Sequence, residues 1–199
     1  CLENTQGGKP LSIDYLTEAT TFARANNLSC HLDGARVFNA ALAVNAPVRD
    51  VCAPFDTISI CLSKGLGTPM GSVLVGSAEL INKARRWRKM LGGGLRQVGI
   101  VAAAGLYALE HNIERLSDDH RRASELATHL NGIESLGEAV AYTNMVFLET
   151  TDATMQKLRV YLQENDVLIS GGRLVLHKDI SDSDLDQLFG LVTAFAHQP

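Results

Sequence analysis

Residues 58–71, ISICLSKGLGTPMG, join an apolar run of strand length to a loop that holds one lysine and three glycines. The run extends over 57–63 and is almost continuously apolar, as is typical of a strand covered on both faces. Lys64 follows this strand directly. An ammonium group at the mouth of a buried strand is costly to desolvate, so its position indicates a functional lysine. The simpler alternative is a lysine on a solvated loop.

A strand–helix–strand unit precedes this lysine. Its predicted elements are a strand over 28–33, a helix over 37–44, a loop bracketed by Pro47 and Pro54, and the strand over 57–63. Parallel strands joined in this way cross over with a right hand, and ligands bind at the carboxyl ends of such strands. Asp33 and Lys64 should therefore lie at the same edge of one sheet.

The other elements complete an α/β chain. We predict helices over 11–27, from Ser77 to about 91, and over 97–116, 118–131, 153–165 and from Ser181 onward; further strands are predicted over 72–76, 142–149, 167–169 and 173–177. The strand over 72–76 begins too soon after Lys64 for a helical crossover, so it should run antiparallel to its predecessor. Residues 92–97 form a glycine-rich loop that carries Arg96.

The bulk composition argues against a membrane span and a nucleic-acid surface. The 199 residues have a formal net charge of −4, and no apolar stretch reaches the roughly 18 residues that indicate a spanning helix. The basic run 83–89 (KARRWRK) fits a solvated helix face better than a phosphate-binding surface. The four cysteines, Cys1, Cys30, Cys52 and Cys61, lack metal-ligand spacing. We therefore predict no metal site and a reducing, cytoplasmic location.

Lys64 and Asp33 suggest a specific chemistry. A lysine amine forms a Schiff base with the carbonyl of pyridoxal phosphate, and this cofactor also needs an anion facing its pyridine nitrogen. Asp33, one strand away at the same edge, is placed to provide that anion. The alternatives are a turn aspartate with a surface lysine, or a dinucleotide-binding loop at 65–71. The glycine spacing and Pro69 disfavour the dinucleotide loop.

Five motifs resemble those of the low-specificity L-threonine aldolases, pyridoxal phosphate enzymes of the aspartate-aminotransferase-like class. They are CLENT at 1–5, HLDGAR at 31–36, SKGLG at 63–67, GGGLRQ at 92–97 and RLVLH at 173–177. The resemblance covers essentially the whole chain. It implies that residues 1–116 are the C-terminal portion of a cofactor-binding large domain, with a mostly parallel sheet and helices on both faces. Residues 117–199 would form a small C-terminal α/β domain.

The resemblance also implies roles for individual residues. Lys64 would be the Schiff-base lysine, and Asp33 would face the pyridine nitrogen. Arg36 and Arg173 would contact the cofactor and the substrate carboxylate, while Arg96 would reach the cofactor phosphate of a neighbouring subunit. A guanidinium matches carboxylate and phosphate oxygens in a fork, in agreement with these roles. On residue type alone, a surface ion pair is the more usual role for Arg96 and Arg173.

Two histidines are candidate bases, because histidine titrates near neutral pH. His31 precedes Asp33 by two positions in a strand, so it shares that face and is expected to orient the aspartate. For His31 and for His177 we favour a structural role over a catalytic one.

The reaction implied by the resemblance is aldol cleavage of L-threonine or L-allo-threonine, both β-hydroxy-α-amino acids, to glycine and an aldehyde. The alternatives are another pyridoxal phosphate lyase, such as a β-eliminating lyase, or a non-catalytic chain that serves as a dimerisation partner. A homo-oligomer, dimer or tetramer, with shared active sites is implied. The phosphate loop and the ring-stacking residue would lie upstream of Cys1, so we expect an N-terminally incomplete chain that functions with the missing segment.

Overall fold

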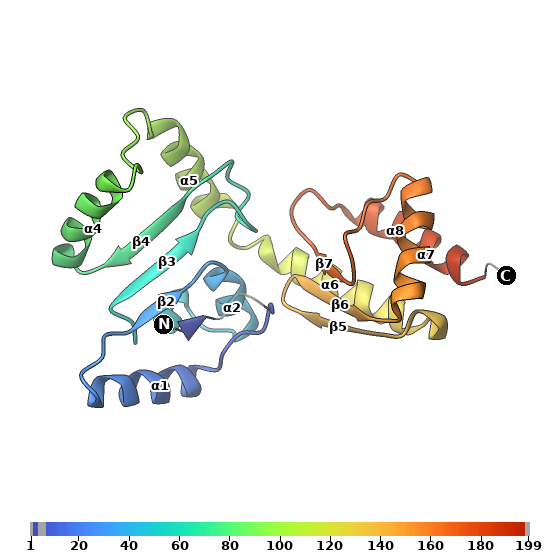
Figure 1. The fold of residues 1–199 in the computed structure, drawn as a ribbon, viewed down its shortest axis with the longest axis horizontal. Coiled ribbons are helices and arrows are strands. Elements are labelled where there is room, and N and C mark those ends of the chain that lie inside the picture. The colour runs from blue at the N-terminus through green and yellow to red at the C-terminus, as the bar shows by residue number, and fades with distance from the viewer. Residues whose placement is uncertain (1, 4–6, 198–199) are drawn as a thin grey trace. The chain divides into compact units, whose positions relative to one another are not determined.

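The structure, a computed structural model, describes residues 2–3 and 7–197 (Figure 1). Residues 1–116 and 117–199 form two compact units. Each unit has its own sheet and its own hydrophobic core. The assignment of the first unit to a cofactor-binding large domain stays a prediction.

The first unit is an α/β unit with a mainly parallel sheet. Its elements are β1 (Leu2–Glu3), α1 (Ile13–Ala25), β2 (His31–Asp33), α2 (Val37–Ala43), α3 (Val48–Cys52), β3 (Thr57–Cys61), β4 (Ser72–Gly76), α4 (Ala78–Met90) and α5 (Gly99–His111). The strands lie in the order β1-β2-β3-β4. β1, β2 and β3 run parallel and β4 runs antiparallel to β3, which confirms both predicted strand directions. Of the CLENT motif, Leu2 and Glu3 form β1 and the rest lies outside the described residues.

The core of the first unit lies between the sheet and helices α1, α2 and α3. Leu32 of β2 and Ile58 of β3 are paired in register, so they point to the same face. They are buried together with apolar residues of the three helices, including Leu16, Val37 and Val51. Apolar side chains that recur every three or four residues thus give each helix a buried stripe against the sheet.

Coverage of the strands differs from the sequence prediction. Within β3 only Ile58 is buried, whereas the apolar run predicted burial on both faces. Strand β4 is more open still, because Val73, Leu74 and Val75 are all exposed. No residue of α4 is buried, which agrees with the prediction that 83–89 is a solvated helix face.

Two connections in the first unit differ from the predictions. The segment between Pro47 and Pro54 was predicted to be a loop, but it contains the one-turn helix α3. Pro47 is the N-cap residue of this helix, and its carbonyl accepts the Asp50 N–H at 2.9 Å. The helix predicted over 97–116 ends at His111 instead, with Asn112 as its C-cap.

The second unit packs its helices against an antiparallel sheet. Its elements are α6 (Leu116–Asn131), a short 3-10 helix (Glu134–Leu136), β5 (Glu138–Tyr142), β6 (Met145–Glu149), α7 (Asp152–Glu164), β7 (Arg173–Val175) and α8 (Asp182–Ala196). The strand order is β5-β6-β7. Residues of α6, α7 and α8 share one core with Val146 and Leu148 of β6. Helix α8 begins with a capping box, because Ser181 and Asp184 bond each other's backbone N–H.

Two strand predictions in the second unit are wrong. The single strand predicted over 142–149 is the end of one strand, a tight turn and β6. Thr143 makes this turn with a φ of 49°, and no glycine or proline marks it in the sequence. Residues 167–169 form no strand, because Val167 and Ile169 pack against the core without a ladder partner.

Within 2–3 and 7–197, no helix combines the length and apolar character needed to cross a bilayer. Over the same residues, no group of three or more His, Cys, Asp or Glu side chains is arranged to hold a metal ion. Cys30, Cys52 and Cys61 are free thiols, and burial raises the pKa of the Cys52 thiol.

Asp182 links α8 to α6 in the second unit. Its Oδ1 accepts bonds from Arg122 Nε and Arg121 Nη2, both at 2.7 Å. These hydrogen bonds, that of Arg122 first, lower the pKa of the Asp182 carboxyl below its usual value. The ionised carboxylate therefore stabilises the folded state above the pKa that Asp182 has in the unfolded chain.

We predict that Asp182→Asn lowers the unfolding midpoint at neutral pH. The difference from the unchanged protein should shrink below about pH 4, where the unfolded aspartate gains its proton and the folded one follows at lower pH. Denaturant unfolding between neutral and acidic pH measures this difference. Asp186→Asn is the control, since this exposed residue on the same helix has no ion pair among the described residues. A difference that stays constant with pH would contradict the assignment.

Candidate active site

The parallel pairing of β2 and β3 brings Asp33 and the loop of Lys64 to one edge of the sheet. Asp33 is the last residue of β2 and pairs with Ser59 of β3. Strand β3 ends at Cys61, and Lys64 follows in the next turn. Both residues thus lie at the carboxyl ends of neighbouring parallel strands, where open α/β sheets bind ligands.

Asp33 is held in a tight turn. Its Oδ1 accepts the backbone N–H of Ala35 at 3.1 Å, and the half-buried side chain makes no other hydrogen bond with the described residues. Gly34 is buried, and a Cβ at this position would lie 2.9 Å from the carbonyl oxygen of Ser59. Glycine at this position therefore lets the turn lie directly against β3.

Lys64 extends from a loop whose backbone is well anchored. Its carbonyl accepts the Gly67 N–H at 2.8 Å, and Thr68 N donates to the carbonyl of Leu62 at 3.1 Å. Leu66 is buried in a small core cluster. The lysine itself is exposed, so the predicted cost of desolvating its ammonium does not arise in this structure. The backbone is fixed while the amine is accessible.

Two residues that the sequence analysis did not identify support this loop from α5 and the segment after it. Asn112 Nδ2 donates to the carbonyl of Leu66 at 2.7 Å, and Arg115 Nη1 donates to the carbonyl of Gly65 at 3.3 Å. The signal that could have revealed the first contact is asparagine at a helix end, a common capping residue. Both contacts span more than forty residues in sequence, so a local pattern can mark the asparagine as a cap but cannot identify the partner of either side chain.

Arg36 belongs to the same turn as Asp33. It is the N-cap residue of α2 and half-buried, and the carbonyl of Arg36 accepts the Ala40 N–H at 3.1 Å. The HLDGAR motif therefore places a carboxylate and a guanidinium in one short segment at the carboxyl end of β2.

Arg96 is exposed in the loop between α4 and α5, and no hydrogen bond or ion pair joins it to the described residues of the first unit. Helix α5 has 13 residues, so its two ends are about 20 Å apart. Arg96 precedes the first end of α5, whereas Asn112 at the other end contacts the Lys64 loop. The structure therefore does not bring Arg96 into contact with Asp33 or Lys64.

Arg173 belongs to the second unit and is the first residue of β7. The residue is exposed, and its guanidinium Nη2 donates to the sulfur of Met145 at 3.3 Å. Glycine precedes it, and a Cβ on Gly172 would collide with the carbonyl of Leu148. Because Gly172 has no side chain, the backbone can lie close to the Leu148 carbonyl, and Arg173 can begin strand β7 beside β6.

The two candidate bases each contact a nearby residue, and His31 does not contact the aspartate that it was expected to orient. His31 Nδ1 lies 2.8 Å from Thr57 Oγ1 on the adjacent strand, rather than bonding to Asp33. The exposed His177 contacts Asp179, with Nδ1 accepting the backbone N–H at 3.4 Å. Both contacts agree with structural roles.

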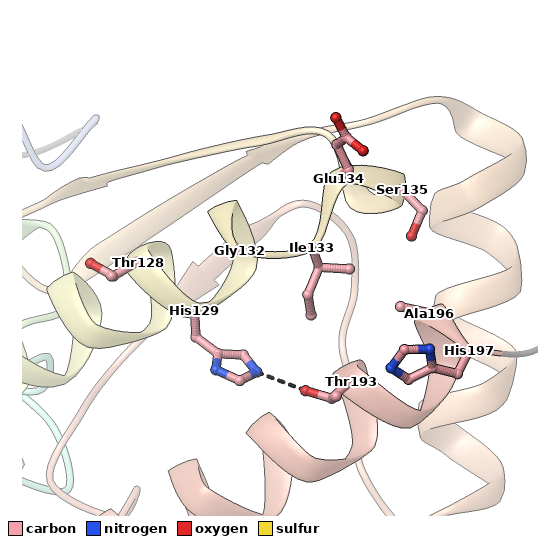
Figure 2. Close-up of a pocket in the computed structure, with 9 residues that line it drawn as sticks. All are labelled: Thr128, His129, Gly132, Ile133, Glu134, Ser135, Thr193, Ala196 and His197. Carbon is pink, nitrogen blue, oxygen red and sulfur yellow. Dashed lines mark hydrogen bonds between the residues drawn. The ribbon is translucent and has the colours of Figure 1, made fainter.

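A separate hollow of about 940 Å³ lies on the second unit (Figure 2). His129 on its wall is bonded through Nε2 to Thr193 Oγ1 at 3.1 Å and stacks on Phe189 with 4.2 Å between ring centres. His197 also lines the hollow. None of the predicted site residues lines the hollow.

The Asp33–Lys64 edge fits pyridoxal phosphate at two points. Lys64 offers an accessible amine on a fixed backbone, and Asp33 has a carboxylate oxygen, Oδ2, that bonds no described residue. An amine for the aldehyde carbon and a carboxylate for the ring nitrogen are the groups that this cofactor requires.

Similar proteins are found among the lyases and the threonine aldolases. The family model for the beta-eliminating lyases matches residues 1–153. The chain is 44% identical to the low specificity L-threonine aldolase of Escherichia coli K12 over 98% of its own length and 59% of that protein. It is 43% identical to low-specificity L-threonine aldolase 1 of Arabidopsis thaliana, over 93% of this chain and 55% of that protein. The chain thus spans somewhat more than half of these relatives.

The fold is also that of a solved threonine aldolase. The structure of the Leishmania major enzyme superposes with a TM-score of 0.80, covering 98% of this chain and 60% of the other, at 16% identity. The predicted fold class is therefore confirmed. The roles of the individual site residues stay predictions.

We predict that Gly34→Ala destabilises the first unit by about 1–3 kcal/mol, since the new methyl group has no room beside the Ser59 carbonyl. The control is Gly190→Ala in α8, where no atom lies within 4 Å of the added Cβ. That change should stabilise the protein by about 0.5–1 kcal/mol, because alanine favours helix. Urea unfolding of both variants measures their free energies of unfolding. Equal values for the two would contradict the close approach of Gly34 to the Ser59 carbonyl.

Proposed function

Because this chain belongs to the beta-eliminating lyase family, we propose that it carries the lysine and the aspartate of a pyridoxal phosphate lyase that cleaves L-threonine and L-allo-threonine. The products are glycine and acetaldehyde. The observation that carries the proposal is the placement of Asp33 and Lys64 on neighbouring parallel strand ends. The names of the similar E. coli and Arabidopsis enzymes support the choice of substrate.

The residues of the chain have separate tasks in this reaction. Lys64 holds the cofactor through its amine, and Asp33 faces the ring nitrogen, where its carboxylate keeps a proton in place. When bound, pyridoxal phosphate supplies a ring that withdraws the electrons released as the Cα–Cβ bond breaks. Arg36, in the same turn as Asp33, contacts the cofactor and the substrate carboxylate.

Arg173 binds the substrate carboxylate. The support for this role is an exposed guanidinium that makes no ion pair with the carboxylates of the described residues. Its charge is thus available to an anionic ligand, which a guanidinium binds through two parallel hydrogen bonds.

The protein acts as a homo-oligomer with shared active sites, and Arg96 reaches the cofactor phosphate of a neighbouring subunit. The first support is that Arg96 is exposed near the end of α5 that lies away from Asn112. The second is that its apolar neighbours Leu95, Val98 and Ile100 are exposed as well. Exposed apolar side chains next to a charged residue are typical of an interface. The free thiols of the described cysteines support a cytoplasmic location.

The products distinguish the proposal from a β-elimination, the alternative that the name of the matching family favours. The natural-length protein is incubated with L-threonine, and glycine, acetaldehyde and ammonia are measured. Glycine and acetaldehyde in equal amounts support the aldolase. Ammonia without glycine would instead indicate a β-eliminating lyase.

We predict that Asp33→Asn keeps the cofactor attached but lowers kcat by well over an order of magnitude. A neutral amide cannot stabilise a positive ring nitrogen, and that charge assists the release of electrons from Cα. A steady-state assay, with cofactor content measured on the same sample, gives the result. A loss of tenfold or less, about 1.4 kcal/mol, would speak against this role.

A mixing experiment tests the shared site. Arg96→Ala and Lys64→Ala subunits are each expected to be nearly inactive, but a mixed dimer contains one site with both natural residues. Random exchange should therefore restore up to about one quarter of the natural activity in a two-fold dimer. If subunits exchange but no activity returns, Arg96 acts within its own chain or not at all.

A further inference from the structure

We propose that Met145 is a positioning residue for Arg173. Its sulfur fixes the direction of the guanidinium and leaves the positive charge free for the carboxylate of the substrate. The inference rests on the proposed function, in which Arg173 binds that carboxylate.

The register of the sheet brings the two side chains together. Phe147 pairs with Arg173, and Met145 pairs with Val175 across the antiparallel β6–β7 ladder. Met145 is therefore the diagonal neighbour of Arg173 on the same face, within reach of a long side chain. Arg173 Nη2 donates to the Met145 sulfur at 3.3 Å.

The register is fixed at both ends. Beyond Met145, Leu176 N donates to the Asn144 carbonyl at 2.8 Å, and Asn144 Nδ2 donates to the Leu176 carbonyl at 2.8 Å. Ahead of Arg173, Leu148 N donates to the carbonyl of Gly172 at 2.8 Å. These bonds hold Met145 and Arg173 at constant positions along the two strands.

The burial of the two side chains differs sharply. Met145 is 0% exposed, whereas Arg173 is exposed. Burial restricts the conformations of the Met145 side chain, so its sulfur is a fixed point against which the exposed arginine is aligned. The opposite face of β6 carries Val146 and Leu148, which belong to the core of the unit.

A thioether differs from the usual partner of an arginine in having no charge. In the same unit, Arg121 and Arg122 share the Asp182 carboxylate, and each also pairs with a second carboxylate, so their charges are compensated. Arg173 forms no ion pair with the carboxylates that the structure describes. Sulfur is a weak neutral acceptor, so it restricts the guanidinium without competing with an anionic ligand for its charge.

The test is a double-mutant cycle on the natural-length enzyme. Met145→Leu keeps an apolar side chain of similar size and removes the acceptor. We expect the KM for L-threonine to rise about threefold to tenfold, the equivalent of one modest hydrogen bond, with kcat within about twofold of the natural value. In an Arg173→Ala background the same change should alter KM by less than about twofold, because the residue that it positions is gone.

Met155→Leu is the matched control. Met155 packs against the core of the same unit and makes no hydrogen bond to Arg173. The KM of the Met155→Leu enzyme for L-threonine should therefore stay unchanged. If Met145→Leu impairs folding, replacement of methionine by norleucine, which lacks the sulfur but keeps the shape, should raise KM in the same way.

The failures are distinguishable. An equal rise in KM with and without Arg173 would overturn the positioning role, since it would report packing alone. A large effect of Arg173→Ala with none from Met145→Leu would also overturn it, while leaving the proposed function intact. An unchanged KM in Arg173→Ala would remove the substrate role of the arginine and this inference with it.

Discussion

The parallel pairing of β2 with β3 is the constraint on which the candidate site depends. It sets Asp33 opposite Ser59 and Leu32 opposite Ile58, so one face of both strands is buried while their carboxyl ends meet at one edge. A shift of one residue would turn Leu32 away from the core, and the apolar burial therefore fixes the register. The same burial that stabilises the unit also places the carboxylate of Asp33 beside the loop of Lys64.

Both units combine fixed backbones with accessible side chains at the proposed site residues. In the first unit, the Leu66 contacts hold the loop while the amine of Lys64 stays exposed. In the second unit, the register of β6 and β7 holds the backbone of Arg173, and a buried sulfur aligns its exposed guanidinium. Such an arrangement lets a site bind a ligand without ordering its own backbone first. The conformational entropy of this backbone is lost during folding, so it is not lost again when a ligand binds.

The sequence predicted the features that depend on local patterns. Apolar runs and a short connection were enough to predict the parallel β2–β3 pair, the antiparallel β4 and the shared edge of Asp33 and Lys64. Features without a local signal were missed. Thr143 turns the chain without glycine or proline, and the bond from Asn112 to Leu66 joins segments far apart in sequence. The exposure of Lys64 was also missed, because an apolar run shows that a strand is apolar but not what covers it.

We propose that Lys64 is the residue to which pyridoxal phosphate is attached. Borohydride reduction of the natural-length enzyme with pyridoxal phosphate fixes the cofactor on the lysine that holds it, and peptide mapping by mass spectrometry identifies that lysine. The account predicts a single modified peptide that contains Lys64, and its loss in Lys64→Ala. A label on Lys83 or Lys89 of helix α4 instead would contradict the account.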